Sequence, residues 1–145
     1  MIEEGCRIVP YRAEWAPAFD RLNRAWLEAD FTVEPLDEVY LQDPEGAVIR
    51  PGGQIFFAVE GERVLGTCAA IPQEDGSFEL AKLAVDPSAQ GRGLGRRLAE
   101  AVIAYAAERG ATRLFLLERR LRDLRHRRIL RRWDMLHRVR GCLLQ

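Results

Sequence analysis

The sequence has few cysteines, only two histidines and no long apolar run. Its three cysteines, Cys6, Cys68 and Cys142, are widely spaced and form no Cys-x-x-Cys or Cys/His pattern, which argues against a disulfide framework or a metal site. No apolar run approaches the roughly 20 residues of a membrane span, and the first residues lack the basic and apolar regions of a signal peptide. We therefore expect a cytoplasmic protein with no bound metal and no membrane partner.

The sequence also has no net charge, but its charged residues are unevenly distributed along the chain. The 145 residues include 22 basic and 22 acidic side chains. Residues 1–118 hold 12 Arg or Lys against 20 Asp or Glu, a net charge of −8, whereas residues 119–145 hold 10 Arg against 2 Asp, a net charge of +8. The length suits one domain. We predict that this domain spans residues 1–118 and that residues 119–145 form a divergent basic C-terminal segment.

Hydrophobic periodicity predicts a sheet flanked by helices. Between residues 14 and 29 apolar residues recur at three- and four-residue steps, the pattern of an amphipathic helix with Trp15, Phe19 and Trp26 in the core. Two β-rich segments separated by only two residues predict a hairpin. The order β-α-α-β-β-β-α-β indicates an α/β or α+β mixed sheet. The predicted elements are strands at Cys6–Tyr11, Gln54–Glu60, Arg63–Ile71, Ser77–Val85 and Thr112–Leu117, helices at Glu14–Ala29, Leu36–Gln42 and Gly93–Arg109, and a loop at Asp43–Gly53.

A glycine-rich turn between a strand and a helix is the strongest functional signal. Gly91, Gly93 and Gly95 remove side chains where the backbone enters the helix. Successive N–H groups would then point outward at the positive end of the helix dipole, an arrangement that binds phosphate oxygens. Positive charge around the turn comes from Arg92, Arg96 and Arg97.

Two common phosphate-binding motifs do not fit this turn. No Gly-Lys-Ser/Thr follows it, as in a P-loop. The glycines are spaced two apart throughout, unlike the Rossmann pattern, and no acidic residue ends a second strand about 20 residues later. The residues alone therefore leave open a strand-to-helix turn without a ligand.

The segment Gln90–Gly95, Gln-Gly-Arg-Gly-Leu-Gly, resembles the Q/R-x-x-G-x-G/A signature of GNAT acetyltransferases. The preceding Leu83–Pro87 resembles the fourth strand of that family and its exit, and the resemblance extends over about residues 6–117. It implies a GNAT-like acyl-CoA N-acyltransferase fold. It also implies acetyl transfer from acetyl-CoA, as co-substrate, to a primary amine of a small molecule or peptide.

The resemblance also implies roles for individual residues. Backbone amides of the turn would bind the pyrophosphate, and main-chain groups of the preceding strand would pair with the pantetheine arm. Transfer would be direct, so no nucleophilic side chain is needed. The residues expected to bind acetyl-CoA are Leu83, Val85, Gln90, Gly91, Arg92, Gly93, Leu94, Gly95 and Arg96.

Glu79 is the candidate catalytic base, because a catalytic glutamate occupies the corresponding place in one branch of the family. Strand alternation predicts that Glu79 shares a face with Ala81, Leu83 and Val85, and that Lys82 lies on the opposite face. The alternatives are a solvated glutamate at a strand end and a glutamate that only binds a cationic substrate.

Four carboxylates cluster between the first two helices, a region that helps to form the acceptor site in the family. They would suit a cationic amine, but a solvated acidic loop is the interpretation that we favour. These residues are Asp30, Glu34, Asp37 and Glu38.

After residue 117 the sequence departs from the family pattern. It shows no clear further strand, and no tyrosine follows Tyr105, so the family's usual general acid is absent. An apolar stripe in residues 119–139 predicts a helix. This helix would replace the missing C-terminal strands and cover the open sheet edge, or would pair two chains as a homodimer.

Two other interpretations of the C-terminal segment stay open. It could be the product of a shifted reading frame, or a basic arm for nucleic acid or an anionic membrane. The arginines are not interleaved with aromatic residues for base stacking, so nucleic acid is not our expected partner. The loss of the family's C-terminal pattern also leaves a rival function, a catalytically impaired CoA-binding domain that acts as an interaction or regulatory module.

Overall fold

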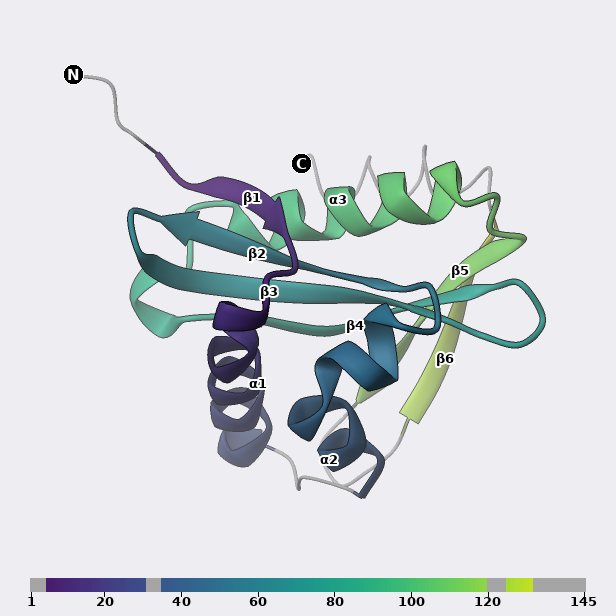
Figure 1. The fold of residues 1–145 in the computed structure, drawn as a ribbon, viewed down its shortest axis with the longest axis horizontal. Coiled ribbons are helices and arrows are strands. Elements are labelled where there is room, and N and C mark those ends of the chain that lie inside the picture. Colours follow the sequence, from purple (N-terminus) through teal and green to yellow (C-terminus); the bar gives the residue numbers. More distant parts are fainter. Residues whose placement is uncertain (1–4, 31–34, 120–124, 132–145) are drawn as a thin grey trace.

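The computed structural model describes residues 5–30, 35–119 and 125–131 (Figure 1). Its element order confirms the predicted one and adds a strand at the end. The strands are β1 (Arg7–Pro10), β2 (Gln54–Glu60), β3 (Arg63–Pro72), β4 (Phe78–Val85), β5 (Arg113–Arg119) and β6 (Arg125–Arg131). The helices are α1 (Ala16–Asp30), α2 (Pro35–Gln42) and α3 (Leu94–Glu108), with short helical turns η1 (Ala13–Trp15), η2 (Glu45–Ile49) and η3 (Pro87–Ala89).

The strands form one mixed sheet in the order β1-β2-β3-β4-β5-β6. Neighbouring strands are antiparallel except β4 and β5, which are parallel. Parallel neighbours need a crossover connection, and α3 lies between these two strands in the sequence. The mixed α/β sheet predicted from the sequence is therefore confirmed.

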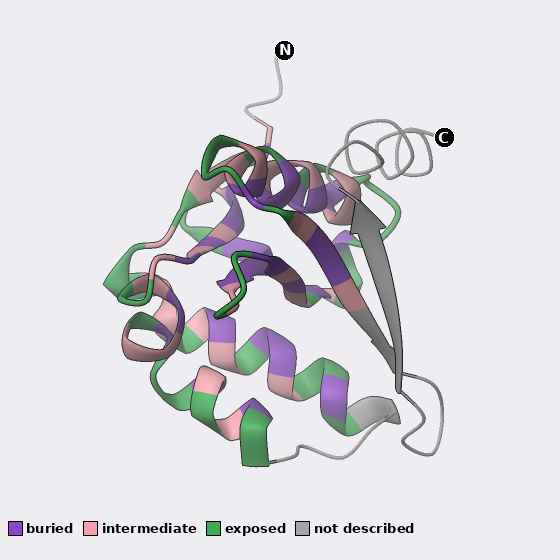
Figure 2. Ribbon diagram, turned by 90° about the vertical axis from the view of Figure 1, so that its right-hand side faces the viewer, coloured by how far each residue is buried: buried purple, intermediate pink, exposed green. Residues whose placement is uncertain are grey.

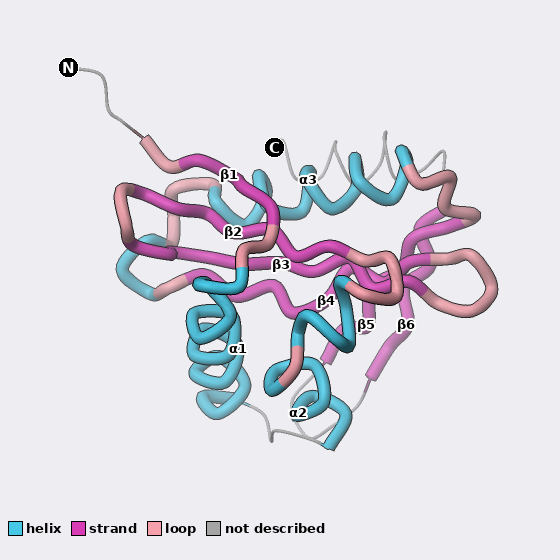
Figure 3. The backbone as a smooth tube through the Cα atoms, viewed as in Figure 1, coloured by secondary structure: helices cyan, strands magenta, loops and turns pink. Residues whose placement is uncertain are grey.

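Helices cover both faces of the sheet, so the fold has three layers (Figures 2 and 3). On one face α3 buries its apolar side against β2, β3 and β4. On the other face lie α1, α2 and η2. Alternation along β2 supplies both cores, since Ile55 and Phe57 pack toward α1 whereas Ala58 packs toward α3. Among the described helices none is both long and apolar enough to cross a membrane.

The turn residues of the sequence predicted the β2–β3 hairpin correctly and the connection between α2 and β2 incompletely. The hairpin is confirmed: only Gly61 and Glu62 separate β2 from β3, and Gly61 has a φ of 62°, which glycine adopts without strain. The predicted loop 43–53 instead contains the π-helical turn η2. Its Val48 is fully buried against the sheet, and that burial outweighs the prolines and glycines around it.

The C-terminal segment closes the sheet with a strand, so the expected replacement of the family's C-terminal strands by a helix is wrong for residues 125–131. β6 pairs antiparallel with β5 along its whole length, from Arg113↔Arg131 to Arg119↔Arg125. The reason is the open edge itself, because a strand pairs its N–H and C=O groups directly and a helix cannot. The remaining predicted helix, residues 120–124 and 132–139, lies outside the described residues.

Deleting residues 120–145 should make the protein self-associate. The deletion removes β6 and leaves the backbone groups of β5 at an open edge. The apparent mass in sedimentation or light scattering should then rise with protein concentration. Deleting only residues 132–145 keeps β6 and serves as the control. A chain ending at residue 119 that stays monomeric at high concentration would show that the edge needs no cover.

Candidate functional site

The central feature of the site is a fork between two parallel strands. The pairing of β4 with β5 spans three residue pairs and ends at Leu80↔Leu116, whereas β4 continues to Val85. Beyond Leu80, β5 and β6 run away from β4 (Figures 1 and 3). On its other side β4 stays paired with β3 as far as Val85. One edge of β4 between Ala81 and Val85 therefore has main-chain groups that β5 does not pair.

A bulge in β4 sets which side chains face this fork. Lys82 and Leu83 together oppose one residue of β3, and Lys82 has a φ of 56°, the only positive φ outside glycine among the described residues. The bulge shifts the alternation by one residue. Glu79 and Ala81 face the α1/α2 side, whereas Val85 packs on the α3 side. The expectation that Glu79 and Val85 share a face is therefore wrong.

The same bulge directs Lys82 to α2. Its ammonium donates a hydrogen bond to Asp37 Oδ1, and the two side chains are only 14% and 4% exposed. The Lys82 Nζ atom also lies 5.8 Å from the ring centroid of Tyr40. Two predictions are corrected here: Lys82 lies on the Glu79 side of the sheet, and Asp37 is a buried ion-pair partner rather than part of a solvated loop.

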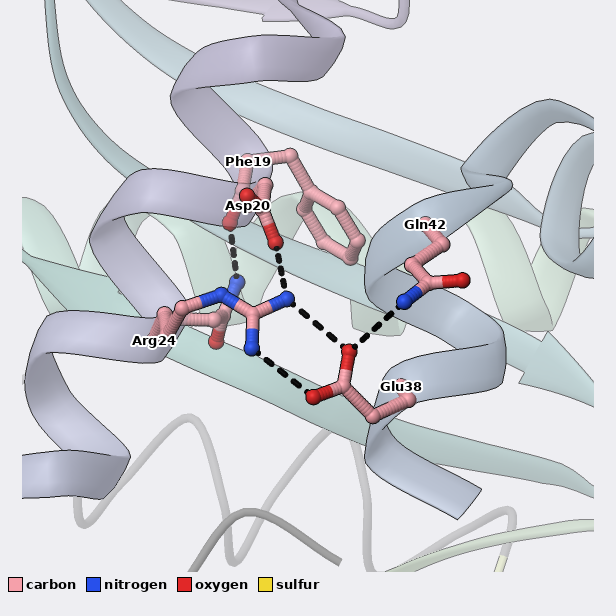
Figure 4. A network of polar contacts seen from close by, with 6 residues as sticks. Phe19, Asp20, Arg24, Glu38 and Gln42 are labelled. Carbon is pink, nitrogen blue, oxygen red and sulfur yellow. Dashed lines mark hydrogen bonds and ion pairs between the residues drawn. The ribbon is translucent and has the colours of Figure 1, made fainter. Parts of the chain in front are cut away.

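A second ion pair ties α2 to α1 (Figure 4). Arg24 of α1 donates to both carboxylate oxygens of Glu38, at 2.9 and 3.0 Å, and to Asp20 Oδ1 at 2.7 Å. Hydrogen bonds from Arg24 lower the pKa of Glu38. Adjacent residues of α2 are thus paired with basic residues from two different elements. Of the other predicted acidic residues, the Asp30 side chain and the whole of Glu34 lie outside the described part of the chain.

A pocket of about 390 Å³ lies between α1, α2 and β4, next to the fork. Glu79 lines this pocket, and in β4 it immediately precedes Leu80, the last residue that pairs with β5. Trp26 also lines it and is 42% exposed, so its predicted place in the core is wrong, whereas Phe19 is fully buried as expected. Burial, together with the negative charge of Glu79, raises the pKa of Tyr40 in the same pocket. The Tyr40 hydroxyl therefore keeps its proton at neutral pH.

The other end of the β4 edge leads into the glycine-rich turn. Asp86 accepts hydrogen bonds from the Ser88 N–H at 2.9 Å and the Ser88 hydroxyl at 2.7 Å, which lower its pKa and start η3. The Gln90 side chain donates to the Val85 carbonyl at 3.4 Å. Gly93 has a φ of 79° and is the N-cap of α3, as its predicted place at the helix start requires. The first N–H groups of a helix have no acceptor within the helix, so this end of α3 can bind an anion.

The space in front of this helix end is open. A Cβ atom built on Gly91, Gly93 or Gly95 would meet no atom within 4 Å. Gly95 has no positive φ either, so neither packing nor backbone conformation within the chain requires glycine there. Glycine costs a helix about 1 kcal/mol relative to alanine. Its presence is consistent with a ligand that approaches the backbone closely.

The arginines near the turn differ in what they contact. Arg92 forms an ion pair with Glu60 at the end of β2, at 2.8 Å. Arg97 donates to the carbonyl of Cys6 at 2.8 Å, which links α3 to the start of β1. Arg96 lies half-buried in the first turn of α3. The predicted positive charge is thus present at the turn, although Arg97 also has a structural contact.

The described cysteines are not candidate nucleophiles. Cys6 and Cys68 are buried and form no disulfide. Burial raises the pKa of Cys6, and it raises the pKa of Cys68 to about 12, so both stay as thiols at neutral pH. Among residues 5–30, 35–119 and 125–131, no cluster of His, Cys, Asp and Glu could hold a metal ion.

The ion pair between Lys82 and Asp37 should contribute strongly to stability. Lys82→Met keeps the side-chain length but leaves the buried Asp37 carboxylate without this cation, so the free energy of unfolding should fall by ~3 kcal/mol. Arg24→Met, at the more exposed pair, should lower the free energy of unfolding by much less, because an exposed ion pair is screened by solvent. Denaturant unfolding measures both.

A double-mutant cycle isolates this interaction. Asp37→Asn combined with Lys82→Met should cost less than the sum of the two single changes, by roughly 0.5–3 kcal/mol. Additive losses would show that the two side chains do not stabilise each other.

Comparison with known proteins agrees with this architecture. The Acetyltransferase (GNAT) family matches residues 14–132, whereas no curated protein matches the sequence. Solved structures with the same fold include a GNAT-family acetyltransferase from Staphylococcus aureus, with a TM-score of 0.72, 19% identity, and 79% of this chain and 74% of that chain covered. A GNAT acetyltransferase from Brucella melitensis in complex with acetyl-CoA has a TM-score of 0.68 and 22% identity over 80% and 77% of the two chains.

An aminoglycoside 6'-N-acetyltransferase from Enterococcus faecium is also similar, with a TM-score of 0.60 and 22% identity over 77% of this chain and 61% of that chain. At these identities the structures show the fold alone. The family match covers most of the chain and continues past the predicted boundary at residue 118 through β6. The chain therefore belongs to the GNAT family of acetyltransferases.

Proposed function

We propose that this protein is an N-acetyltransferase that transfers the acetyl group of acetyl-CoA directly to a primary amine of a small molecule or peptide. The observation that supports this best is the course of the β4 edge. It leads from the open glycine turn at the start of α3, along main-chain groups that β5 does not pair, to the pocket that Glu79 lines. The proposed phosphate site, the proposed site for an extended chain and a carboxylate would thus follow one another along β4 and the turn after it.

The residues at the turn fit the pyrophosphate of acetyl-CoA. In this proposal the N–H groups of residues 91–96 donate to its oxygens, favoured by the positive end of the α3 dipole. Gly95 leaves room for this approach, and Arg92 and Arg96 supply positive charge nearby. The Brucella melitensis structure, which shares this fold, is a complex with acetyl-CoA and supports acetyl-CoA as the ligand.

The unpaired edge of β4 fits the pantetheine arm. The amides of the pantetheine arm would pair with the main chain of Leu83 and Val85, in the way that an added strand pairs with a sheet edge. The bulge at Lys82 and Leu83 leaves backbone groups outside the β3–β4 ladder. An N–H group there is the kind of donor that a developing oxyanion needs. Bound acetyl-CoA would supply the acetyl thioester, with a carbonyl carbon for the amine to attack and a thiolate as leaving group.

Glu79 would act as the general base. An amine must lose a proton before it can attack, and Glu79 is placed where the pocket meets the fork. As a carboxylate it also attracts the ammonium form of the substrate to this position. The protein thereby contributes a proton acceptor and an oriented approach, and no covalent intermediate on a side chain is needed.

The first prediction for this proposal concerns the pyrophosphate site. Acetyl-CoA at 100 times its Kd should stabilise the protein by ~2.7 kcal/mol. Gly95→Leu should abolish this shift, because its side chain would fill the open space before the helix. The free protein should be unchanged or up to ~1 kcal/mol more stable, since leucine favours a helix. Gly95→Ala, which the family signature permits, is the matched control. A normal shift in Gly95→Leu would place the ligand elsewhere.

A separate prediction concerns Glu79. Glu79→Gln keeps the shape of the side chain but removes the base, so kcat should fall by roughly 10²–10⁴-fold, with little change in the affinity for acetyl-CoA. Thiol release during turnover of an amine measures kcat. Near-normal turnover would exclude Glu79 as the base and leave a water path to solvent. Acetyl-CoA binding without thiol release for any amine would instead support the rival function, a CoA-binding module without catalysis.

A further inference from the structure

We infer that Asp37 is a specificity-determining residue, which keeps the chain's own lysine, Lys82, from being acetylated in place of the substrate amine. This role rests on the proposed function, because it requires that acetyl-CoA gives its acetyl group to amines in the pocket between α1, α2 and β4. Three observations support it: the chemistry of Lys82, its position in β4, and the contacts that hold its ammonium.

Lys82 is the one primary amine that a side chain contributes to this protein, because the sequence contains no other lysine. The remaining Arg and Lys positions are all arginine, whose guanidinium stays charged. Lys82 also lines the same pocket as Glu79, the proposed base. A site that deprotonates amines in this pocket therefore has an amine of its own within it, and that amine competes with the substrate.

The backbone of Lys82 lies where the acyl donor is expected. Lys82 precedes Leu83, whose main chain is proposed to pair with the pantetheine arm. Both residues lie beyond Leu80, the last residue of β4 that pairs with β5. Paired chains in a sheet lie about 4.8 Å apart, and the flexible four-carbon stem of a lysine can span that spacing. A released Lys82 amine could therefore reach an acyl group bound at this edge.

Asp37 holds the amine in a different place. The Lys82 ammonium donates a hydrogen bond to Asp37 Oδ1, and its Nζ atom lies 5.8 Å from the centroid of the Tyr40 ring. Both partners belong to α2, so these contacts direct the amine to the helix and not along the edge of β4. The Asp37 side chain is only 4% exposed. Loss of a proton from Lys82 would leave this buried carboxylate without its cation, which is strongly unfavourable.

The reaction that the ion pair would prevent is acetyl transfer to Lys82 itself. An ammonium has no lone pair, so Lys82 must first give a proton to the group that accepts it from the substrate amine, Glu79 in the proposed function. The Lys82 nitrogen would then attack the carbonyl carbon of the acetyl group. The C–N bond forms, the C–S bond breaks, and the electron pair leaves with the sulfur of CoA, which takes up a proton from solvent. The products are acetylated Lys82, which has lost its charge, and free CoA.

Incubation of the full chain with acetyl-CoA, without an added amine, tests this role by mass spectrometry. Asp37→Asn should gain one acetyl group at Lys82 at least ~10-fold faster than the wild type, because a carboxylate in contact holds an amine in its charged form. Trypsin locates the group: it cleaves after an unmodified Lys82, whereas acetylation leaves the peptide from Val64 to Arg92 intact. A folded Asp37→Asn that acetyl-CoA stabilises but that stays unmodified would overturn the inference.

Two controls separate loss of the carboxylate from other effects. Arg24→Met removes an ion pair between α1 and α2 but keeps Asp37, so Lys82 should stay unmodified. Gly95→Leu added to Asp37→Asn should abolish the acetylation, because acetyl-CoA would no longer bind. Acetylation of Lys82 in Arg24→Met, or in the wild type at the rate of Asp37→Asn, would overturn the inference. Undiminished acetylation in the double variant would do so as well, since the acetyl group would then come from free acetyl-CoA.

If Asp37→Asn does not fold, Leu83→Lys decides the question in a chain that keeps the ion pair. Leu83 lines the pocket and is 36% exposed, so this substitution puts a second amine beside the expected acyl group without disturbing a buried charge. Acetylation at position 83, with Lys82 unmodified, would support the inference. Acetylation at Lys82, or at neither position, would overturn it.

Turnover of added amines by the wild type separates this role of Asp37 from the proposed function. If the wild type acetylates a primary amine but Asp37→Asn leaves Lys82 unmodified, the proposed function stands and the role of Asp37 is wrong. If Asp37→Asn acetylates Lys82 but the wild type releases no thiol with any of a panel of primary amines, the role of Asp37 stands and the proposed transfer to a separate substrate fails.

Discussion

The ion pair between Lys82 and Asp37 joins the bulge of β4 to α2, and both residues line the pocket of the candidate site. Lys82 lies in the β4 bulge with a left-handed backbone conformation, which costs a residue other than glycine about 1–3 kcal/mol. Its ammonium bonds to the buried carboxylate of Asp37 on α2 and thereby stabilises the bulge. The bulge in turn exposes Leu83 and turns Val85 toward α3, whereas Glu79, which precedes the bulge, lines the pocket. Lysine can make this contact because its ammonium is a compact charge on a flexible side chain. Lys82 is the only lysine among the 22 basic residues of the sequence.

The glycines of the chain illustrate two different reasons for a missing side chain. A Cβ atom on Gly53 would come within 2.4 Å of the Ala70 carbonyl oxygen, so the packing of the sheet requires this glycine. Gly95 has no such neighbour and an ordinary backbone conformation. It lies in the first turn of α3, where glycine weakens the helix. Selection for stability alone would favour another residue there, so Gly95 indicates a ligand more strongly than the motif as a whole does.

The sequence predicted features that depend on local chemistry and missed those that depend on register. Helix periodicity, the two-residue hairpin turn and the glycine turn each act over a few residues, and the structure has these elements within about three residues of the predictions. The bulge at Lys82 follows from the pairing of β4 with β3, which no short pattern encodes. Strand alternation therefore placed Lys82 and Val85 on the wrong faces. Trp26 has the spacing of a core residue, but the opposing sheet surface is the pocket and not the core. The strand β6 was missed because its arginines hide the β pattern.

Different elements of the candidate site would bind the acyl donor and the acceptor. Under the proposed function, binding of the acyl donor would depend mainly on backbone groups of β4 and of the start of α3, which change little when side chains change. The pocket that would take the acceptor is lined by side chains of α1 and α2, such as Trp26 and Leu36. These helices are held by two ion pairs, one to β4 and one between α1 and α2. Substitutions on the inner side of the helices can therefore alter which amine fits, while the ion pairs keep α2 at a fixed distance from the fork. This separation lets one fold serve different acceptors.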